Sequence, residues 1–309
     1  MLKLAIASLL LFVLIHNIKI ENIQSALKHA NFAFISLAGL LIIPNLIIQT
    51  LKWHYLLKLC KPNATHFEAA KSLLAGFTLG FITPGRIGEF GRAIFVKDCN
   101  RLQVLGLTMV DKLFSISIVF LMGTIALFLF WGVKLRSELI GLWLAIALAA
   151  LFLVASLVLF PDRLRNILDK IKLRLPFKEK SDLLLSGLDN FRRRQAVRLL
   201  GLNFIFYIIF VTQFYFLLSA FETIQWIDGY LVVASTTVAK SLLPISFGDL
   251  GIRETAAIYF VSQIGVQAST AFNASIFMFL INIVLPSSIG FSLLMTEKMN
   301  HHFNRKCSQ

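Results

Sequence analysis

The stretch that decides the fold runs from Leu105 to Trp131 and reads LGLTMVDKLFSISIVFLMGTIALFLFW. It exceeds the about 20 mostly apolar residues that an α-helix needs to cross a bilayer core, and its only charges are Asp111 and Lys112. Similar stretches predict further spans over Leu4–Ile15, Ala30–Thr50, Leu139–Phe160, Leu199–Phe221 and Ala271–Met295. Because no small-residue cleavage site follows Leu4–Ile15, we expect this N-terminal stretch to be an uncleaved span. The pattern predicts an all-α polytopic membrane protein with about six full transmembrane helices.

The composition supports a membrane protein and excludes the soluble and disordered classes. Hydrophobic residues make up 57% of the 309 residues and charged residues 15%, against about 25% charged in soluble domains. The net charge of +14 is typical of cytoplasmic loops that follow the positive-inside rule, so we expect no nucleic-acid partner. The 3 Cys lack metal-ligand spacing, and we expect no disulfide framework, no metal and no cofactor.

The distribution of Lys and Arg sets the orientation. With the N-terminus in the cytoplasm, most of the 30 basic residues fall in cytoplasmic segments, and this count includes Lys52 and Arg92. The external loops then hold only Lys19, Lys28, Lys134 and Arg136. We therefore expect both termini in the cytoplasm of a bacterial-type inner membrane. A basic cytoplasmic loop would cover residues 161–198, and a cytoplasmic tail would cover residues 296–309. Within the loop, Asp162–Phe177 predicts either a basic interfacial helix or a solvated helix that caps the bundle.

Two other apolar stretches, Phe67–Thr83 and Tyr230–Leu243, each run into a Pro- and Gly-containing break. The first break reads TPGRIGEFGR over Thr83–Arg92, and the second reads LPISFGDLGIRE over Leu243–Glu254. The offset that joins Gly85 to Gly248 also joins Gly88 to Gly251 and superposes the flanking spans. We predict a single integral membrane domain over residues 1–309 with an inverted-topology repeat: span, broken hairpin, span, over about 30–131 and again over about 193–295. Whether the hairpins are re-entrant or cross the membrane fully is left open.

The hairpin breaks are candidate binding elements. Interrupted segments in two inverted halves point to a transporter's substrate site, because irregular backbone in a membrane needs protein or a water-filled cavity around it. A helix that begins at such a break presents N–H groups suited to phosphate. Alternatively, the glycines only allow close helix packing. The residues that form the breaks are Pro84, Gly85, Gly88, Pro244, Gly248 and Gly251.

Charged residues at membrane depth are costly and usually face a cavity or pair with one another. Our candidate substrate-binding residues are Arg86, Glu89, Asp111, Lys240, Asp249, Arg253 and Glu254. Arginine suits phosphate, whereas Glu89, Asp111 or Glu254 would couple protons or contact a headgroup amine. Alternatively, Arg86–Glu254 and Arg253–Glu89 salt bridges would lock the two repeats together. Adjacent helical residues face apart, so Asp111 and Lys112 should have different partners.

At TPGRIGEFGR and PISFGDLGIRE the sequence resembles the flippase-like family built on the transmembrane region of lysylphosphatidylglycerol synthase. The resemblance covers nearly the whole chain, from the first span to Met295. It implies a polytopic flippase-like fold and a role in moving lipids between leaflets. The soluble aminoacyltransferase domain of the synthases has no counterpart in this sequence, so we expect no lipid lysylation and no enzyme activity.

These observations predict a flippase-like protein that translocates an anionic phospholipid or a polyprenyl-phosphate-type lipid between leaflets. The expected partners are the bilayer and a lipid with an anionic headgroup, and homo-oligomerisation is left open. Two alternatives remain. The first is an intramembrane enzyme that uses the same carboxylates as acid and base to modify a lipid-linked sugar or phosphate. The second is a non-catalytic scaffold for a cell-envelope complex.

Overall fold

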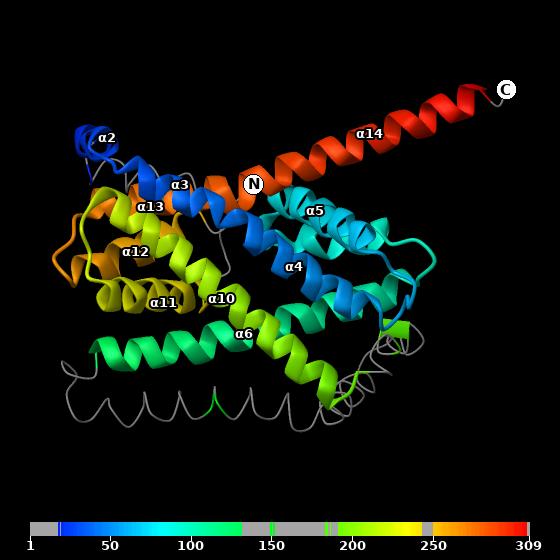
Figure 1. The fold of residues 1–309 in the computed structure, drawn as a ribbon, viewed down its shortest axis with the longest axis horizontal. Coiled ribbons are helices and arrows are strands. Elements are labelled where there is room, and N and C mark those ends of the chain that lie inside the picture. Colours follow the sequence, from blue (N-terminus) through cyan, green and yellow to red (C-terminus); the bar gives the residue numbers. More distant parts are fainter. Residues whose placement is uncertain are drawn as a thin grey trace.

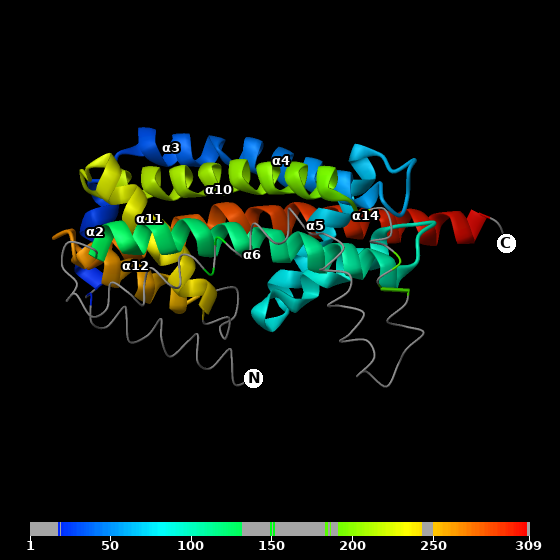
Figure 2. The same cartoon turned by 90° about the horizontal axis from the view of Figure 1, so that it is seen from below.

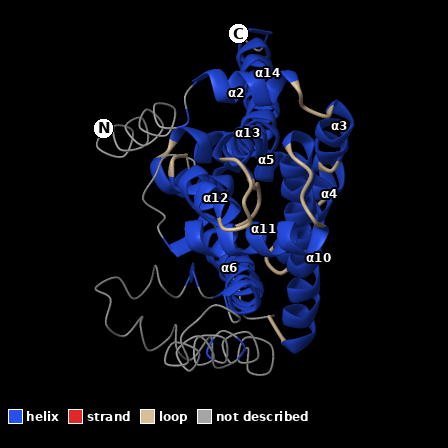
Figure 3. Ribbon diagram, turned by 90° about the vertical axis from the view of Figure 1, so that its left-hand side faces the viewer, coloured by secondary structure: helices blue, strands red, loops and turns tan. Residues whose placement is uncertain are grey.

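The computed structural model describes residues 18, 20–131, 149, 151, 183, 184, 186, 191–242 and 250–307, and these contain helices and no strand (Figure 3). Several predicted features lie outside the described residues. They are the span Leu4–Ile15, nearly all of the span Leu139–Phe160, most of the loop 161–198 with its helix Asp162–Phe177, and the break residues Pro244, Gly248 and Asp249.

Four of the predicted spans are confirmed as helices long and apolar enough to cross a membrane. They cover Phe32–Leu57, Arg101–Phe130, Arg193–Phe221 and Ala268–Thr296. The chain is therefore a multi-pass membrane protein. The last span is interrupted: α13 (Ala268–Phe279) passes through the π-helix η3 (Leu280–Val284) into α14 (Leu285–Cys307). Figure 1 shows α14 extending beyond the bundle toward the C-terminus.

The elements before residue 132 form the first half of the described fold. After α2 (Ile20–Lys28) come α3 (Phe32–Leu40), α4 (Ile42–Leu57), α5 (His66–Ile82), the 3₁₀ helix η1 (Pro84–Phe95) and α6 (Arg101–Trp131). Thr65 caps α5 by accepting a hydrogen bond from the Glu68 N–H at 3.1 Å. The helix ends at Ile82, and Thr83 is extended because the following Pro84 disfavours a helical residue before it.

The second half has a comparable order of elements. It contains α10 (Arg193–Phe221), α11 (Trp226–Leu242), α12 (Ile252–Ser262) and the interrupted span from α13 to α14. In both halves a long helix precedes a 17-residue helix, and a shorter helical segment and a second long span follow it. Figure 2 shows α4 and α10 lying next to each other along one side of the molecule, where they are in contact.

Helix α5 and η1 pack closely as the two legs of a hairpin, because glycines line their contact. A Cβ atom added at Gly80 would lie 2.7 Å from the Glu89 Cγ, and one added at Gly76 would lie 3.2 Å from the Arg92 Cβ. Gly88 faces the carbonyl of Leu79 so closely that no side chain fits there. Small residues at such contacts bring two backbones together, which holds η1 and its charged side chains against α5.

The two halves interlock through the 17-residue helices. In the first contact, α5 packs on α14: Thr78 Oγ1 donates to the Ser287 carbonyl at 2.9 Å, and Ser287 Oγ donates to the Phe77 carbonyl at 3.1 Å. In the second contact, α11 packs on α6, where Gly123 faces the Val238 side chain. Each 17-residue helix therefore lies against the last long span of the other half.

Candidate functional site

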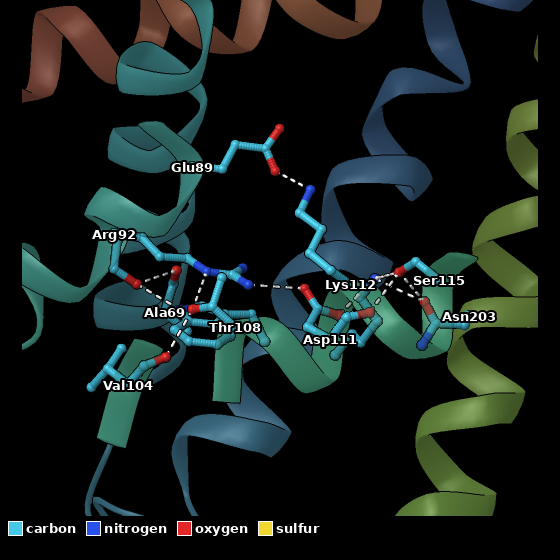
Figure 4. Close-up of polar contacts among 12 residues, drawn as sticks. Ala69, Glu89, Arg92, Val104, Thr108, Asp111, Lys112, Ser115 and Asn203 are labelled. Atoms are coloured by element: carbon cyan, nitrogen blue, oxygen red, sulfur yellow. Dashed lines mark hydrogen bonds and ion pairs between the residues drawn. The ribbon is translucent and has the colours of Figure 1, made fainter. Parts of the chain in front are cut away.

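A buried carboxylate, Asp111 on α6, lies at the centre of the polar site shown in Figure 4. Its Oδ1 is 3.0 Å from the Lys52 Nζ on α4, and its Oδ2 is 3.1 Å from the Arg92 Nη2 on η1. All three side chains are buried. The three residues therefore join α4, η1 and α6 by ion pairs inside the helix bundle. Such groups persist at membrane depth only when they are paired and hydrogen-bonded.

The Lys52 ammonium group also donates hydrogen bonds to two neutral acceptors. It donates to Ser115 Oγ at 3.1 Å and to Asn203 Oδ1 on α10 at 3.0 Å. The Asn203 amide in turn donates to the Leu199 carbonyl at 2.8 Å. The first helix of the second half therefore contributes a ligand to a lysine of the first half.

The Arg92 guanidinium is fixed on two further sides. Its Nε donates to Thr108 Oγ1 at 2.9 Å, and its Cζ lies 3.8 Å from the centroid of the Trp53 ring. The indole of Trp53 donates to Ser72 Oγ at 2.7 Å. Arginine suits this position because it remains charged when desolvated and can stack on an aromatic face while it donates in plane.

A second carboxylate, Glu89 on η1, bridges two cations. Its Oε1 is 2.5 Å from the Arg86 Nη2, and its Oε2 accepts a hydrogen bond from the Lys112 Nζ. The Glu89 side chain is 9% exposed, whereas the side chains of Arg86 and Lys112 are 25% and 39% exposed. Arg86 also has a left-handed backbone with φ of 57°, a conformation that L-residues adopt rarely. The bridge therefore lies at the boundary between the buried site and its surroundings.

Together these residues form what we call the charged cluster, namely Lys52, Arg86, Glu89, Arg92, Asp111 and Lys112. It holds four cations and two carboxylates, so it carries two surplus positive charges when all six groups are ionised. Asp111 and Lys112 contact different partners, and this prediction is confirmed. The structure brings together three of our predicted site residues, Arg86, Glu89 and Asp111.

The candidate residues of the second half form a separate and local arrangement. Arg253 Nη2 is 2.6 Å from Glu254 Oε1, and the Gly251 N–H donates to Glu254 Oε2 at 2.6 Å. Gly251 has φ of 85°, so a glycine is favoured where the chain turns into α12. Arg253 and Glu254 are 3% and 0% exposed, and within the described residues the Arg253 Nε has no hydrogen-bond partner.

The alternative in which Arg86–Glu254 and Arg253–Glu89 salt bridges lock the two repeats together does not hold in the described residues. Arg86 pairs with Glu89 and Arg253 pairs with Glu254, each within its own half. Arg86 and Glu89 are three positions apart, a spacing at which side chains on a helix meet. Glu254 lies in the first turn of α12, where the Gly251 N–H and Arg253 both contact its carboxylate. Lys240 on α11 lies 5.4 Å over the Phe210 ring.

The N–H groups of Gly88 and Gly251, one in each break, are engaged within the protein. The Gly88 N–H donates to Thr83 Oγ1 at 2.6 Å, and the Gly251 N–H donates to the Glu254 carboxylate. Pro84 and Gly85 form the start of η1. The predicted contacts from phosphate to the N–H groups of Gly88 and Gly251 would therefore require these hydrogen bonds to open. At Gly88 the tight contact with Leu79 supports the alternative of close packing.

Our candidate substrate-binding residues did not include three members of the charged cluster, Lys52, Arg92 and Lys112. The loop count assigned Lys52 and Arg92 to the cytoplasm, whereas both are buried and contact Asp111. The loop count treated both as interface residues, because a basic residue near a span end normally extends its charge into the interface. An unpaired Asp111 in the middle of an apolar run was the available signal, since a buried carboxylate needs a cationic partner.

Comparison with known families identifies a match over most of the chain. The family model of the lysylphosphatidylglycerol synthase TM region matches residues 1–290, which confirms the resemblance found in the sequence. A search of the curated proteins gave no match.

Proposed function

Because the chain belongs to the family of the lysylphosphatidylglycerol synthase transmembrane region, we propose that it translocates a lipid with an anionic headgroup between leaflets. The candidate substrates are an anionic phospholipid and a polyprenyl-phosphate-type lipid. The observation that carries the proposal is the charge of the charged cluster, which has four cations against two carboxylates. An uncompensated positive charge is costly in a low-dielectric site, so a lipid phosphate that enters it is stabilised.

Access from the lipid side supports Arg86 and Lys112 as the phosphate ligands. On α6, Met109 and Ile116 lie three residues before and four residues after Lys112, and both are exposed. Residues at this spacing share one helix face, so Lys112 opens onto an apolar surface that faces lipid tails. Ile87, next to Arg86, is exposed as well. A lipid can thus present its phosphate to both cations while its chains stay in the hydrocarbon.

The same charge balance favours an anionic headgroup over a cationic one. A lysyl headgroup carries two amines for one phosphate, so its net positive charge would be repelled by the net positive charge of the cluster. Glu89 and Asp111 are each held by two cations and are poorly placed to receive a headgroup amine. We therefore propose that the substrate is an unmodified anionic lipid. For the same reason we rank the intramembrane enzyme second, because an ion-paired carboxylate is a weak proton donor or acceptor.

We also propose that the two halves form an inverted-topology repeat. The reciprocal packing of α5 on α14 and of α11 on α6 supports it, because a two-fold relation between halves generates such paired contacts. The charged cluster, however, belongs to the first half, and α10 contributes Asn203 and the Phe206 ring beside Lys52. Arg253 is buried and paired with Glu254, so we place the phosphate site in the first half. We rank the predicted substrate-binding role of Arg253, Glu254, Lys240 and Asp249 below that of the charged cluster.

The proposed location is a bacterial-type inner membrane with both termini in the cytoplasm. The C-terminal end of α4 and the start of α10 lie at one end of the bundle, since the Arg198 guanidinium lies 4.6 Å over the Tyr55 ring. Lys58, Arg193 and Arg194 also belong to these two helix ends. A concentration of Lys and Arg at one end supports a cytoplasmic orientation of that end.

The test is lipid translocation by purified protein in liposomes that contain phosphatidylglycerol, phosphatidic acid, a polyprenyl phosphate, phosphatidylethanolamine or lysylphosphatidylglycerol. We expect translocation of the anionic lipids. A charged hydrogen bond contributes about 1.5–3 kcal/mol, so Arg86→Gln and Lys112→Gln should each slow translocation by about tenfold or more.

The matched control is Lys61→Gln, which removes a lysine paired with Glu68 outside the charged cluster. It should translocate lipids at the wild-type rate. Equal rates for wild type, Arg86→Gln and Lys112→Gln on every lipid would refute the proposed site. Preference for the lysyl lipid would refute the proposed substrate class. A chemically altered lipid in the recovered extract would favour the enzyme instead.

A further inference from the structure

The Glu89 carboxylate presents its two oxygens to two separate cations. Arg86 contacts Oε1, and Lys112 contacts Oε2. A lipid phosphate also carries two charged oxygens on a single atom and binds cations in the same bridging manner. Within the charged cluster Arg86 and Lys112 are the cations with the greatest exposure. The two groups best placed to receive a phosphate are therefore already occupied by an anion of the protein itself.

We infer that Glu89 holds the place of the lipid phosphate in the ligand-free protein, and that the lipid displaces it while Glu89 takes up one proton. This inference rests on the proposed function, because it takes the ligand to be a lipid phosphate. It assigns to Glu89 a role in exchange and not the headgroup-amine contact that the sequence left open. In the exchange one proton passes from water to the Glu89 carboxylate, and no covalent bond of the lipid breaks.

Proton uptake follows from the surroundings of Glu89. The charged groups that face it are Arg86 and Arg92 on η1 and Lys112 on α6, while α5 offers Gly80 at its Cγ. Once phosphate holds Arg86 and Lys112, only Arg92 remains, and that guanidinium is already engaged by Asp111 and Thr108. The displaced carboxylate then lies buried beside a phosphate anion and without its two ion pairs. Each of these conditions favours the protonated form, so Glu89 takes a proton.

Asp111 has a different role in this scheme. Its partners Lys52 and Arg92 are buried and are held by further hydrogen bonds to Ser115, Asn203 and Thr108. This part of the charged cluster stays closed while the pair of Arg86 and Lys112 exchanges one anion for another. Its single surplus positive charge remains close to the exchange site and favours the phosphate over a neutral headgroup.

The experiment measures proton uptake and binding together. Phosphatidylglycerol is added to the purified full chain in weakly buffered detergent, the pH change is recorded, and bound lipid is quantified by native mass spectrometry. Phosphatidylglycerol suits this test because its phosphodiester, unlike a phosphate monoester with a pKa of about 6, keeps its charge near neutral pH. Wild type should take up close to one proton per lipid bound, and its affinity should fall about tenfold per pH unit where Glu89 is ionised.

The variant Glu89→Gln should bind phosphatidylglycerol more tightly than wild type at neutral pH, with no proton uptake and no pH dependence. Glu68→Gln, which removes a carboxylate paired with Lys61 elsewhere, should behave like wild type. Binding by wild type without proton uptake, or the same uptake by Glu89→Gln, would overturn this inference alone. Absence of binding of any anionic lipid by wild type would overturn the proposed function as well. The wild-type measurement stands even if Glu89→Gln does not fold.

Discussion

Replacement of Asp111 by Asn removes the charge that holds Lys52 and Arg92 inside the bundle. The two ion pairs span 3.0 Å and 3.1 Å, and all three side chains are buried. Asparagine preserves the shape and one acceptor oxygen, so the change isolates the charge. After the substitution two cations remain in the interior, and the surplus of the charged cluster rises from two positive charges to three.

The loss of stability in Asp111→Asn depends on the hydrogen bonds that Lys52 and Arg92 retain. Removing one partner of a buried ion pair costs about 3–5 kcal/mol. Lys52 retains Ser115 and Asn203, and Arg92 retains Thr108, so we expect the lower end of this range. About 3 kcal/mol corresponds to a change of about 150-fold in the unfolding equilibrium constant. Glu89→Gln should cost at most about 1 kcal/mol, because its partners Arg86 and Lys112 are partly exposed.

The assay is an unfolding titration in mixed detergent micelles, followed by tryptophan fluorescence, for wild type, Asp111→Asn and Glu89→Gln. A double variant with Lys52→Met and Asp111→Asn should be more stable than Asp111→Asn alone, since it removes one of the unpaired cations. If Asp111→Asn proves no less stable than Glu89→Gln, or if the double variant loses the sum of both effects, the reasoning about buried charge is wrong.

Three further predictions concern the first half. Gly88→Ala should destabilise the protein by about 1–3 kcal/mol through overpacking in the α5–η1 hairpin. Gly201→Ala, inside α10 with open space around it, should not lower the unfolding midpoint, because alanine favours a helix. The hydrogen bond to Glu68 raises the pKa of Lys61. The stabilisation of the fold by this pair is therefore complete below the ordinary lysine pKa of about 10.4 and is lost as pH rises through the pKa of Lys61 in the folded protein. The difference in unfolding free energy between wild type and Glu68→Gln should vanish at strongly alkaline pH. Burial raises the pKa of the Cys60 thiol, so iodoacetamide at neutral pH should modify Cys60 more slowly than an exposed cysteine, measured by peptide mass spectrometry.

The long spans could be predicted from the sequence because apolar length alone specifies a membrane helix. The stretch Leu105–Trp131 lies within α6, and Leu199–Phe221 lies within α10. Both helices begin several residues before the apolar run, since a helix continues beyond the hydrocarbon into the interface. The π-helix Leu280–Val284 within the last predicted span has no comparable signal, because apolar residues fill both helix types equally well.

The sequence located the first break correctly, but it did not predict the conformation of the chain after the break. Pro84 and the glycines after it predicted the end of α5. A 12-residue 3₁₀ segment is longer than such helices usually run. The close packing of η1 on α5, where Gly80 faces Glu89 and Gly88 faces Leu79, explains why η1 persists. That contact depends on the path of the chain after the turn, and no local propensity encodes it.

The sequence predicted which charged residues contribute to the site, but it did not predict their ion-pair partners. Charges at membrane depth singled out Arg86, Glu89 and Asp111, and these three do belong to the charged cluster. The partners Lys52 and Arg92 were placed in the cytoplasm because residue counts assign a charge by its position along the chain. Ion pairs between distant segments depend on tertiary packing, in this case the contacts of α4 and η1 with α6.

The most direct test of phosphate binding at the charged cluster is a structure of the full chain in a nanodisc that contains an anionic lipid. We predict a lipid phosphate within hydrogen-bond distance of both Arg86 and Lys112, with its acyl chains against the exposed face of α6 near Met109 and Ile116. Lipid confined to the outer helix surfaces, with Glu89 still bridging Arg86 and Lys112, would contradict the proposed site.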